Sequence, residues 1–343
     1  MSTGGGGRRV AVTGVSGHWG SQLALRLARD PRVSYVAGID TRPPSADLGD
    51  VDFIEADLRG ALISRLLPAT EVDTIVHCGI LWYPEPGKPA RSLHDFNVIG
   101  TLQLLAACER TPALKRVVLR GSAAIYGSEG AAPLFFTEEL AGEMPLRTRF
   151  QRDISELEGY FANFARRHPE VSCCMLRYQP EIGADLDVPL VRYLSLPMVP
   201  TQLGYDPRLQ LLDADDATAS LEAAVWSDIR DAVNVAPSGA ISLSRILRLA
   251  GRPSVPVPHP LFGPAVERLG ARLGAGPLVG DAVRLLRFGR GVDNRRMVSD
   301  LGFQPQHDAV GTARQFAEKL RARSVGPPLH PGALLGRLAG IGR

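Results

Sequence analysis

Apolar residues form two kinds of pattern along the first half of the chain. Continuous apolar runs end in turn residues, and segments with apolar residues at helical spacing lie between them. Continuous runs are typical of strands buried on both faces of a parallel sheet, and the helical segments would cover those faces. Right-handed crossovers then give a doubly wound, Rossmann-like α/β fold. The runs predict strands within 8–15, 33–40, 51–57, 73–79, 114–122 and 171–178, and the helical patterns lie in 21–30, 101–110 and 154–168.

The second half of the chain is less regular and richer in turn residues. Residues 216–227 and 242–251 predict helices, the second ending at Gly251, and 231–237 predicts a strand. We therefore expect a Rossmann-like domain at 1–180, to which later strands return, and a smaller substrate-binding lobe at 181–325. The tail, 326–343, has leucines at helical spacing but also several glycines, so we expect it to be flexible or weakly helical.

Composition excludes several classes of protein. The 343 residues are 45% hydrophobic and 22% charged, and the net charge of +3 offers no strong field for nucleic acid or an anionic membrane. No apolar run reaches the ~20 residues that a transmembrane helix needs, and 1–10 lacks the apolar core of a signal peptide. The four cysteines form no C-x-x-C pair. We expect reduced packing cysteines, no metal site and a cytoplasmic location.

A glycine-rich turn follows the first predicted strand. The stretch "VAVTGVSGHWG" places Gly14, Gly17 and Gly20 between this strand and a helix, where backbone N–H groups can approach a pyrophosphate at the helix N-terminus. Asp40 ends the second strand, and an acid there accepts hydrogen bonds from a ribose 2′-OH and repels a 2′-phosphate. Arg42 is a complication, because arginine pairs with phosphate. Asp40 lies nearer than Arg42 to the strand end, where the ribose binds, so the sequence predicts NAD as the cofactor.

Further motifs follow in order. "EADLRG", "VHCGI", "FNVIGT", "GSAAIYG", "LRY" and "LLDADDA" stand after the T-G-x-x-G-x-x-G turn. As an ordered set they resemble the extended branch of the short-chain dehydrogenase/reductase superfamily, the NAD-dependent epimerase/dehydratase family, over roughly residues 9–320. Within that family the chain is similar to UDP-glucose 4-epimerase-like proteins. The resemblance implies cofactor contacts from Gly14, Gly17, His18, Trp19, Gly20, Asp40, Arg42, Asp57, Leu58, Cys78, Gly79, Asn97 and Ser122.

The residues expected for catalysis are incomplete. Enzymes of this family use Tyr-x-x-x-Lys, whose spacing puts both side chains on one helix face, and a serine or threonine that Ser122 matches. Alignment of "RFQRDISELEGYF" on Glu158 puts Phe150 at the tyrosine position and Ile154 at the lysine position. No other Tyr-x-x-x-Lys occurs in the sequence. We therefore predict a helix that lacks the usual acid–base pair.

Other residues offer partial substitutes. Asp153 points to nearly the same helix face as Phe150, although a charged helix residue is more often solvated in a surface ion pair. Pro180 and Glu181 stand where many family members have a substrate-facing asparagine, and a buried acid there would oppose a diphosphate. Two functions stay open: an atypical NAD-dependent oxidoreductase or epimerase acting on a nucleotide sugar or another small hydroxyl or carbonyl compound, and a non-catalytic NAD-binding sensor. The resemblance also implies a homodimer through helices 102–110 and 155–164.

Overall fold

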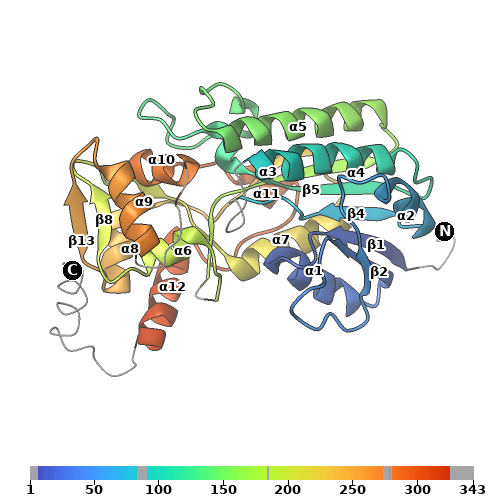
Figure 1. Ribbon diagram of the computed structural model, residues 1–343, viewed down its shortest axis with the longest axis horizontal. Coiled ribbons are helices and arrows are strands. Elements are labelled where there is room, and N and C mark those ends of the chain that lie inside the picture. Colours follow the sequence, from blue (N-terminus) through green and yellow to red (C-terminus); the bar gives the residue numbers. More distant parts are fainter. Residues whose placement is uncertain (1–6, 83–90, 184, 273–277, 279, 325–343) are drawn as a thin grey trace, which may run out of the picture.

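A parallel sheet of seven strands forms the centre of the protein. The computed structural model describes residues 7–82, 91–183, 185–272, 278 and 280–324. The strand order is β11-β6-β5-β4-β1-β2-β3, and every neighbouring pair is parallel. Figure 1 labels β1, β2, β4 and β5 among these strands. Each apolar run that predicts a strand contains one, so the Rossmann-like α/β fold is confirmed. The strands are β1 (Arg8–Thr13), β2 (Val33–Asp40), β3 (Asp52–Glu55), β4 (Thr74–His77), β5 (Arg116–Ser122), β6 (Ser172–Tyr178) and β11 (Asp231–Val235).

The strand order reverses between β1 and β4. From β1 the chain adds β2 and β3 on one side, then returns to add β4, β5 and β6 on the other. At such a reversal the connections leave in opposite directions and a crevice opens beyond the carboxyl ends of the strands. The topology alone therefore fixes where a ligand has room to bind.

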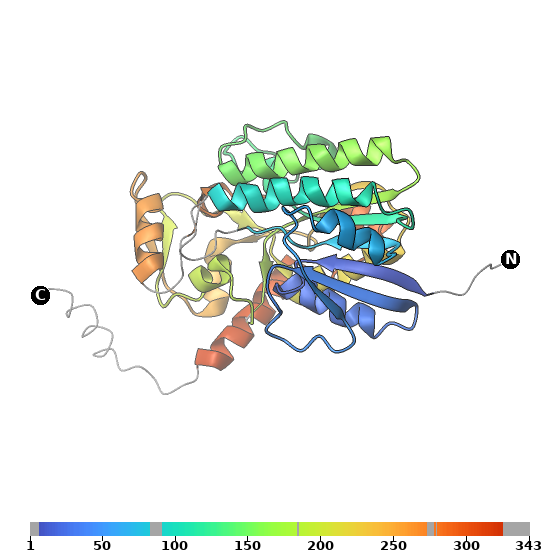
Figure 2. The same ribbon diagram turned by 45° about the vertical axis from the view of Figure 1, so that its right-hand side comes forward.

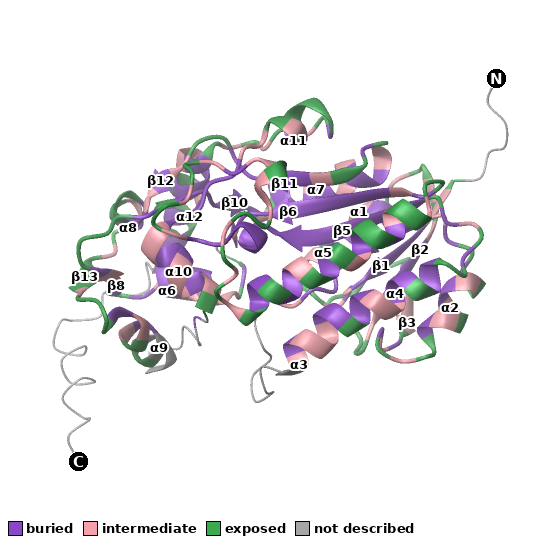
Figure 3. Cartoon of the chain, turned by 90° about the horizontal axis from the view of Figure 1, so that it is seen from above, coloured by how far each residue is buried: buried purple, intermediate pink, exposed green. Residues whose placement is uncertain are grey.

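Helices cover both faces of the sheet, as the sequence predicts (Figure 3). On one face, α4 and α5 lie side by side (Figure 2). Thr148 caps α5 with a capping box: Thr148 Oγ1 accepts a hydrogen bond from Gln151 N (3.2 Å), and Gln151 Oε1 accepts one from Thr148 N (3.1 Å). That face carries α2 (Ile63–Ala69), α3 (Arg91–His94), the π-helical turn η1 (Asp95–Ile99), α4 (Gly100–Cys108) and α5 (Arg149–Arg167). The opposite face carries α1 (His18–Ala28), α7 (Ala214–Trp226) and α11 (Arg295–Ser299).

The later part of the chain builds a C-terminal lobe with its own apolar core beside the sheet (Figure 1). Its α8 ends at Gly251, as predicted, because this glycine adopts the left-handed conformation with φ 65°. Residues 251–264, which are rich in proline, contain one strand, β13, and the start of α9. The boundaries at residues 180 and 325 stay a prediction, and the tail lies outside the described residues. The elements are β7 (Glu181–Ile182), α6 (Pro189–Leu194), β8 (Val199–Gln202), β9 (Arg208–Leu209), β10 (Leu212–Asp213), β12 (Ile241–Ser242), α8 (Leu243–Ala250), β13 (Ser254–Val257), α9 (Phe262–Arg272), α10 (Gly280–Phe288) and α12 (Ala309–Ser324), with short 3₁₀ turns η2 (Ala123–Tyr126) and η3 (Glu138–Leu140) before α5.

The four cysteines are free and buried. Burial raises the pKa of the Cys78 and Cys174 thiols to about 12 and that of Cys173 to about 11, and it also raises the pKa of Cys108. They are packing residues, as the sequence predicts. Among the described helices, none combines the length and the apolar character needed to cross a membrane.

Candidate cofactor and active site

A cavity of about 1160 Å³ lies at the carboxyl ends of the strands. It begins beside Asp40 and Asp57 after β2 and β3, passes the glycine turn after β1, and continues past β4 to Arg120 on β5 and Glu181 after β6. It therefore crosses the point where the strand order reverses. Ten of the thirteen predicted cofactor residues line it: Gly14, Gly17, His18, Trp19, Gly20, Asp40, Arg42, Asp57, Cys78 and Gly79.

The glycine turn requires residues without side chains. Gly14 has a φ of 73°, and a Cβ added there would lie 2.6 Å from Gly79 Cα. A Cβ added at Gly20 would lie 2.3 Å from Gly14 O, so the first turn of α1 is pressed against the loop before it. Gly17 precedes α1 and offers no side-chain cap. The helix N-terminus is thus open toward the cavity, which suits a bound pyrophosphate.

Asp40 is held in place at the end of β2. Its carboxylate accepts hydrogen bonds from Ser16 N (2.9 Å) and Thr41 N (2.7 Å). Ser16 Oγ donates to Arg42 O at 2.5 Å, which ties the glycine turn to the loop after β2. The carboxylate is therefore oriented at the cavity wall where an adenosine ribose would lie.

The end of the cavity beyond β3 is bordered by an ion pair. Arg59 donates to both carboxylate oxygens of Asp57, with Nη2 2.6 Å from Oδ2, and its guanidinium lies 6.0 Å from the ring centre of Phe96. Leu58, predicted beside adenine, is buried in the core and does not line the cavity. Its role as a cofactor contact stays a prediction.

Asn97, which was predicted as a cofactor contact, and His77 of the "VHCGI" motif both act on the structure of the wall. Asn97 is fully buried, and its amide makes hydrogen bonds of 2.8 Å with both N and O of Leu81, which lines the cavity. His77 is bonded through its ring nitrogens to Thr13 Oγ1 (2.6 Å) and Thr101 Oγ1 (3.0 Å), and burial lowers its pKa to about 4. Asn97 therefore fixes the segment after β4, and His77 is a neutral core residue.

The far end of the cavity holds a buried arginine that sequence motifs did not single out. Arg120 is 1% exposed and forms an ion pair with Glu181. Its Cζ lies 4.7 Å from the ring centre of Trp19, 5.0 Å from that of Trp82 and 5.1 Å from that of Tyr178. Burial raises the pKa of Glu181, and the charge of Arg120 opposes that shift.

The positions expected for catalysis lie behind this wall. Ser122, Phe150 and Ile154 are buried, and none of them lines the cavity. Ser122 Oγ accepts a hydrogen bond from Ala124 N (3.2 Å). The ring of Phe150 packs against Trp82, with 6.2 Å between ring centres, and Trp82 does line the cavity.

Asp153 corrects one expectation. The sequence favoured a solvated surface carboxylate, but Asp153 is 3% exposed and its Oδ1 lies 2.9 Å from His94 Nδ1. The expectation was wrong because α5 packs this side against α3 and η1, which a helix seen alone does not show. The pair joins a buried carboxylate to a partly exposed imidazole.

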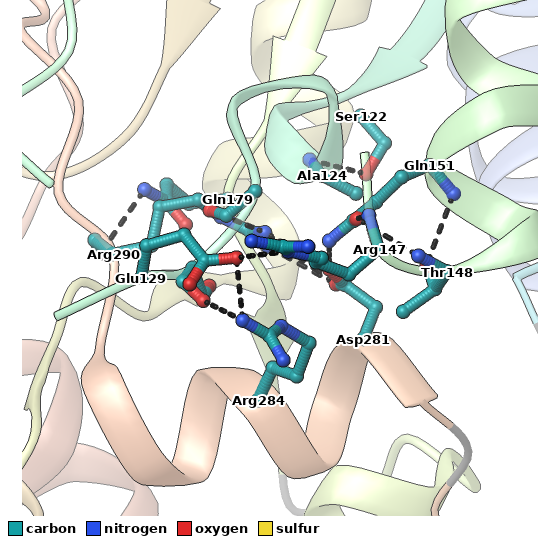
Figure 4. A network of polar contacts seen from close by, with 12 residues as sticks. Ser122, Ala124, Glu129, Arg147, Thr148, Gln151, Gln179, Asp281, Arg284 and Arg290 are labelled. Atoms are coloured by element: carbon teal, nitrogen blue, oxygen red, sulfur yellow. Dashed lines mark hydrogen bonds and ion pairs between the residues drawn. The ribbon is translucent and has the colours of Figure 1, made fainter. Parts of the chain in front are cut away.

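Polar side chains fill the space where the C-terminal lobe meets the start of α5, close to Ser122 (Figure 4). Gln151 Nε2 donates to Asp281 Oδ1 (2.8 Å), and Arg290 Nη1 lies 3.3 Å from the same oxygen. Glu129 pairs with Arg147 and Arg284. The polar side chains of Gln151, Asp281 and Arg290 thus lie near Ser122 (Figure 4).

A second cavity of about 310 Å³ lies between the C-terminal lobe and the loop at 129–134, and it shares no lining residue with the first. Its wall includes Arg208, Arg287 and Arg290 together with Tyr205 and Phe288. Within the described part of the chain, no group of three His, Cys, Asp or Glu side chains is arranged to hold a metal ion.

Comparison with known proteins agrees with this geometry. The model of the family described as "NAD dependent epimerase/dehydratase family" matches residues 10–188. An uncharacterised protein of Mycobacterium tuberculosis is 36% identical over 327 residues, which cover 94% of this chain and 86% of that protein. A UDP-glucose 4-epimerase of Oryza sativa subsp. japonica is 27% identical over 200 residues, 52% of this chain and 51% of that enzyme.

Among solved structures, a UDP-glucose 4-epimerase from Stenotrophomonas maltophila superposes with a TM-score of 0.70 at 18% identity, covering 92% of this chain and 99% of that one. That structure contains NAD and formylated UDP-arabinopyranose. At this identity the match supports the fold.

Proposed function

The chain belongs to the NAD dependent epimerase/dehydratase family, and on this premise we propose that it is an atypical oxidoreductase or epimerase. It acts on a small hydroxyl or carbonyl compound, with a nucleotide sugar as the first candidate. One observation carries the proposal: a single cavity joins the oriented carboxylate of Asp40, the glycine turn and the far wall at Arg120. This arrangement has the order in which a dinucleotide presents its parts.

Cofactor binding follows from the near half of the cavity. Gly14, Gly17 and Gly20 let the backbone and the α1 N-terminus approach the pyrophosphate. Asp40 accepts from the ribose hydroxyls and disfavours the 2′-phosphate of NADP. When NAD is bound, it supplies the hydride acceptor or donor of the reaction. The chain's own residues hold that group and exclude water through Trp19 and Trp82.

The substrate class rests on two supports. A structural neighbour binds a UDP sugar, and the second cavity carries arginines whose guanidinium groups suit a diphosphate. Glu129 and Arg290 line that cavity, and Asp281 and Gln151 lie between these two residues and Ser122 (Figure 4). A substrate that reached from one site to the other would have to displace them.

The proton that accompanies hydride transfer needs another route. With Phe150 and Ile154 at the aligned tyrosine and lysine positions, the proton is relayed by water, by the substrate or by Asp153, which holds His94 Nδ1. An imidazole oriented by a carboxylate leaves its other nitrogen free to exchange a proton. Ser122 stays the candidate for orienting the reacting oxygen.

A second candidate function is a non-catalytic NAD-binding sensor or regulatory protein. The observation that favours it is the burial of Phe150, Ile154 and Ser122 away from the cavity. A protein of this kind would bind NAD and NADH without turnover.

One experiment separates the two functions. Purified protein is titrated with NAD and NADH by calorimetry and then incubated with NAD and UDP-glucose, UDP-glucuronic acid or a cell extract, while the absorbance of the reduced nicotinamide is followed. Enzymatic function predicts reduction or sugar interconversion, which His94→Gln should slow by about 10² or more. NAD binding without any turnover favours the sensor, and absence of NAD binding refutes both.

Quaternary structure and location complete the proposal. A groove of about 480 Å³ between α4 and α5 is lined by Leu102, Leu105 and Tyr160, and we propose that it forms a homodimer interface. Ala106→Glu in this groove should shift sedimentation toward a monomer, with the same change at Ala322, exposed on α12, as control. Four buried reduced cysteines favour the cytoplasm.

A further inference from the structure

The ion pair at the far end of the cavity is only partly satisfied. Arg120 reaches Glu181 through Nη2, but its Nε has no hydrogen-bond acceptor among the described residues. Burying charge is costly unless hydrogen bonds satisfy the remaining donors. Both side chains line the cavity. Buried, incompletely bonded groups in a cavity wall indicate a missing polar partner.

Topology identifies which part of a dinucleotide reaches this wall. The adenosine half belongs to Asp40 after β2, and the pyrophosphate belongs to the glycine turn after β1. The other nucleoside must then lie over the ends of β4, β5 and β6. Arg120 is on β5, and Glu181 follows β6 directly. The pair therefore meets the second base of the dinucleotide.

The chemistry of the pair matches a carboxamide. A primary amide presents one oxygen acceptor and an NH₂ donor, while guanidinium only donates and carboxylate only accepts. The guanidinium of Arg120 lies over the rings of Trp19 and Trp82 and is shielded from water, which strengthens hydrogen bonds to it. A carboxylic acid in place of the amide would bring a second negative charge to Glu181.

We propose that Arg120 and Glu181 clamp the nicotinamide carboxamide, with the guanidinium donating to its oxygen and the carboxylate accepting from its NH₂. This inference rests on the proposed NAD binding and extends it to the recognition of the nicotinamide half. It makes the two residues specificity determinants for the amide form of the cofactor.

The test needs no substrate. The full chain is titrated by calorimetry with NAD, with ADP-ribose, which lacks the nicotinamide, and with nicotinic acid adenine dinucleotide, which carries a carboxylate in place of the amide. We expect NAD to bind at least about tenfold more tightly than either analogue, because hydrogen bonds to charged groups in a buried site are lost or repelled. This comparison uses the unmodified protein and cannot be affected by misfolding of a variant.

Variants assign the effect to the pair. Glu181→Gln should narrow the ratio between NAD and nicotinic acid adenine dinucleotide by about fivefold or more, since a neutral amide no longer repels the carboxylate. Arg120→Lys should weaken NAD binding while leaving ADP-ribose binding nearly unchanged. Asp40→Ala is the matched control: it acts on the adenosine half that all three ligands share, so it should weaken all three by the same factor.

The failures of the two proposals are distinguishable. If none of the three ligands binds, NAD binding and the clamp both fall. If all three bind with equal affinity in the unmodified protein, the clamp is wrong and NAD binding stands. The clamp is also wrong if NAD is preferred but Glu181→Gln, folded by circular dichroism, keeps every ratio.

Discussion

Among the described residues, two arginine–glutamate pairs are buried, and they differ in their surroundings. Arg177 donates to Glu158 through Nε and Nη2, the shortest contact being 2.8 Å, and its Nη1 donates to Tyr126 Oη and Glu138 O at 2.9 Å each. Arg120 has its ion pair with Glu181 and three aromatic rings, and its Nε lacks an acceptor within the described residues. The first pair lies away from the cavity, and the second forms its wall.

The difference separates structural from functional burial. A buried pair with its donors used costs little to keep and much to break. A pair that keeps unused hydrogen-bonding capacity beside a cavity is less stabilising on its own and available to a ligand. The same residue types thus serve two purposes, and the number of satisfied donors tells them apart.

The sharpest test of this comparison removes each arginine. Arg177→Met leaves the buried Glu158 carboxylate without its partner and should lower the free energy of unfolding by about 3–5 kcal/mol. Arg120→Met should cost less, roughly 1–3 kcal/mol, because water entering the cavity can reach Glu181. Urea unfolding of both variants and of the unmodified protein measures the difference.

Equal losses for the two variants would break the comparison. It would also fail if Arg120→Met proved the more destabilising of the two. The full-length chain, followed by tryptophan fluorescence and circular dichroism, shows in addition whether each variant still unfolds in one transition.

The buried, hydrogen-bonded His77 also predicts that the stability of the fold depends on pH. His77 is bonded at both nitrogens, and its pKa is lowered from 6.5 to about 4 by burial. Between these values the unfolded chain takes up a proton that the folded chain does not, so stability falls as the pH drops from 6.5 to 4. The full effect is about 3 kcal/mol. Urea unfolding at a series of pH values measures it.

The control for this prediction is His77→Asn, which cannot titrate. Subtracting its pH profile from that of the unmodified protein removes the contribution of the carboxylates. If the difference in free energy of unfolding between the two proteins stays constant from pH 6.5 to 4, the pH dependence does not come from His77.

At the near end of the cavity, Asp40 should still be able to accept hydrogen bonds from a ligand. Asp40→Ala is expected to weaken NAD binding about tenfold through the loss of hydrogen bonds to ribose, and to narrow the preference over NADP. Its effect on the free energy of unfolding should stay small, since Asp40 is partly exposed. Calorimetric titration with both cofactors tests this, and NADP binding as tightly as NAD in the unmodified protein would refute it.

The smallest expected change in the free energy of unfolding concerns Phe150, at the aligned tyrosine position. Phe150→Tyr adds one hydroxyl beside Trp82 and should change stability by about 1 kcal/mol or less in either direction. Together with Ile154→Lys it is the minimal change that could restore ordinary alcohol oxidation or 4-epimerisation. Because Ile154 is fully buried, the lysine should destabilise more than the tyrosine. Epimerase turnover by the unmodified protein that the folded double variant does not exceed would defeat this prediction.

The sequence predicted the sheet because its signal is repeated and local. Apolar runs such as 33–40 must be buried on both faces, and Gly14 and Gly20 are required by backbone approach within a few residues. Of the far wall, the sequence singled out Trp19 and Glu181 but not Arg120. Arg120 sits in the middle of a strand pattern, and only the fold brings it to Trp19 and Glu181.

A similar reason explains the misjudged Asp153. Its burial depends on how α5 packs against α3, a contact between segments 59 residues apart. An unusual charge within a buried run was the one available signal for Arg120, and it could have been used. No comparable signal marked Trp82, which reaches the cavity through the position that Asn97 gives to its neighbour Leu81.

Because all four cysteines are buried, the folded protein should react very slowly with thiol reagents. Maleimides and iodoacetamide react with the thiolate, and Cys78, Cys173 and Cys174 have pKa values of about 11 to 12 and almost no exposed surface. A single cysteine introduced at an exposed position such as Glu318 on α12 can therefore carry a fluorescent label without removal of the native thiols. The slow labelling of the native thiols then measures how often the folded core opens.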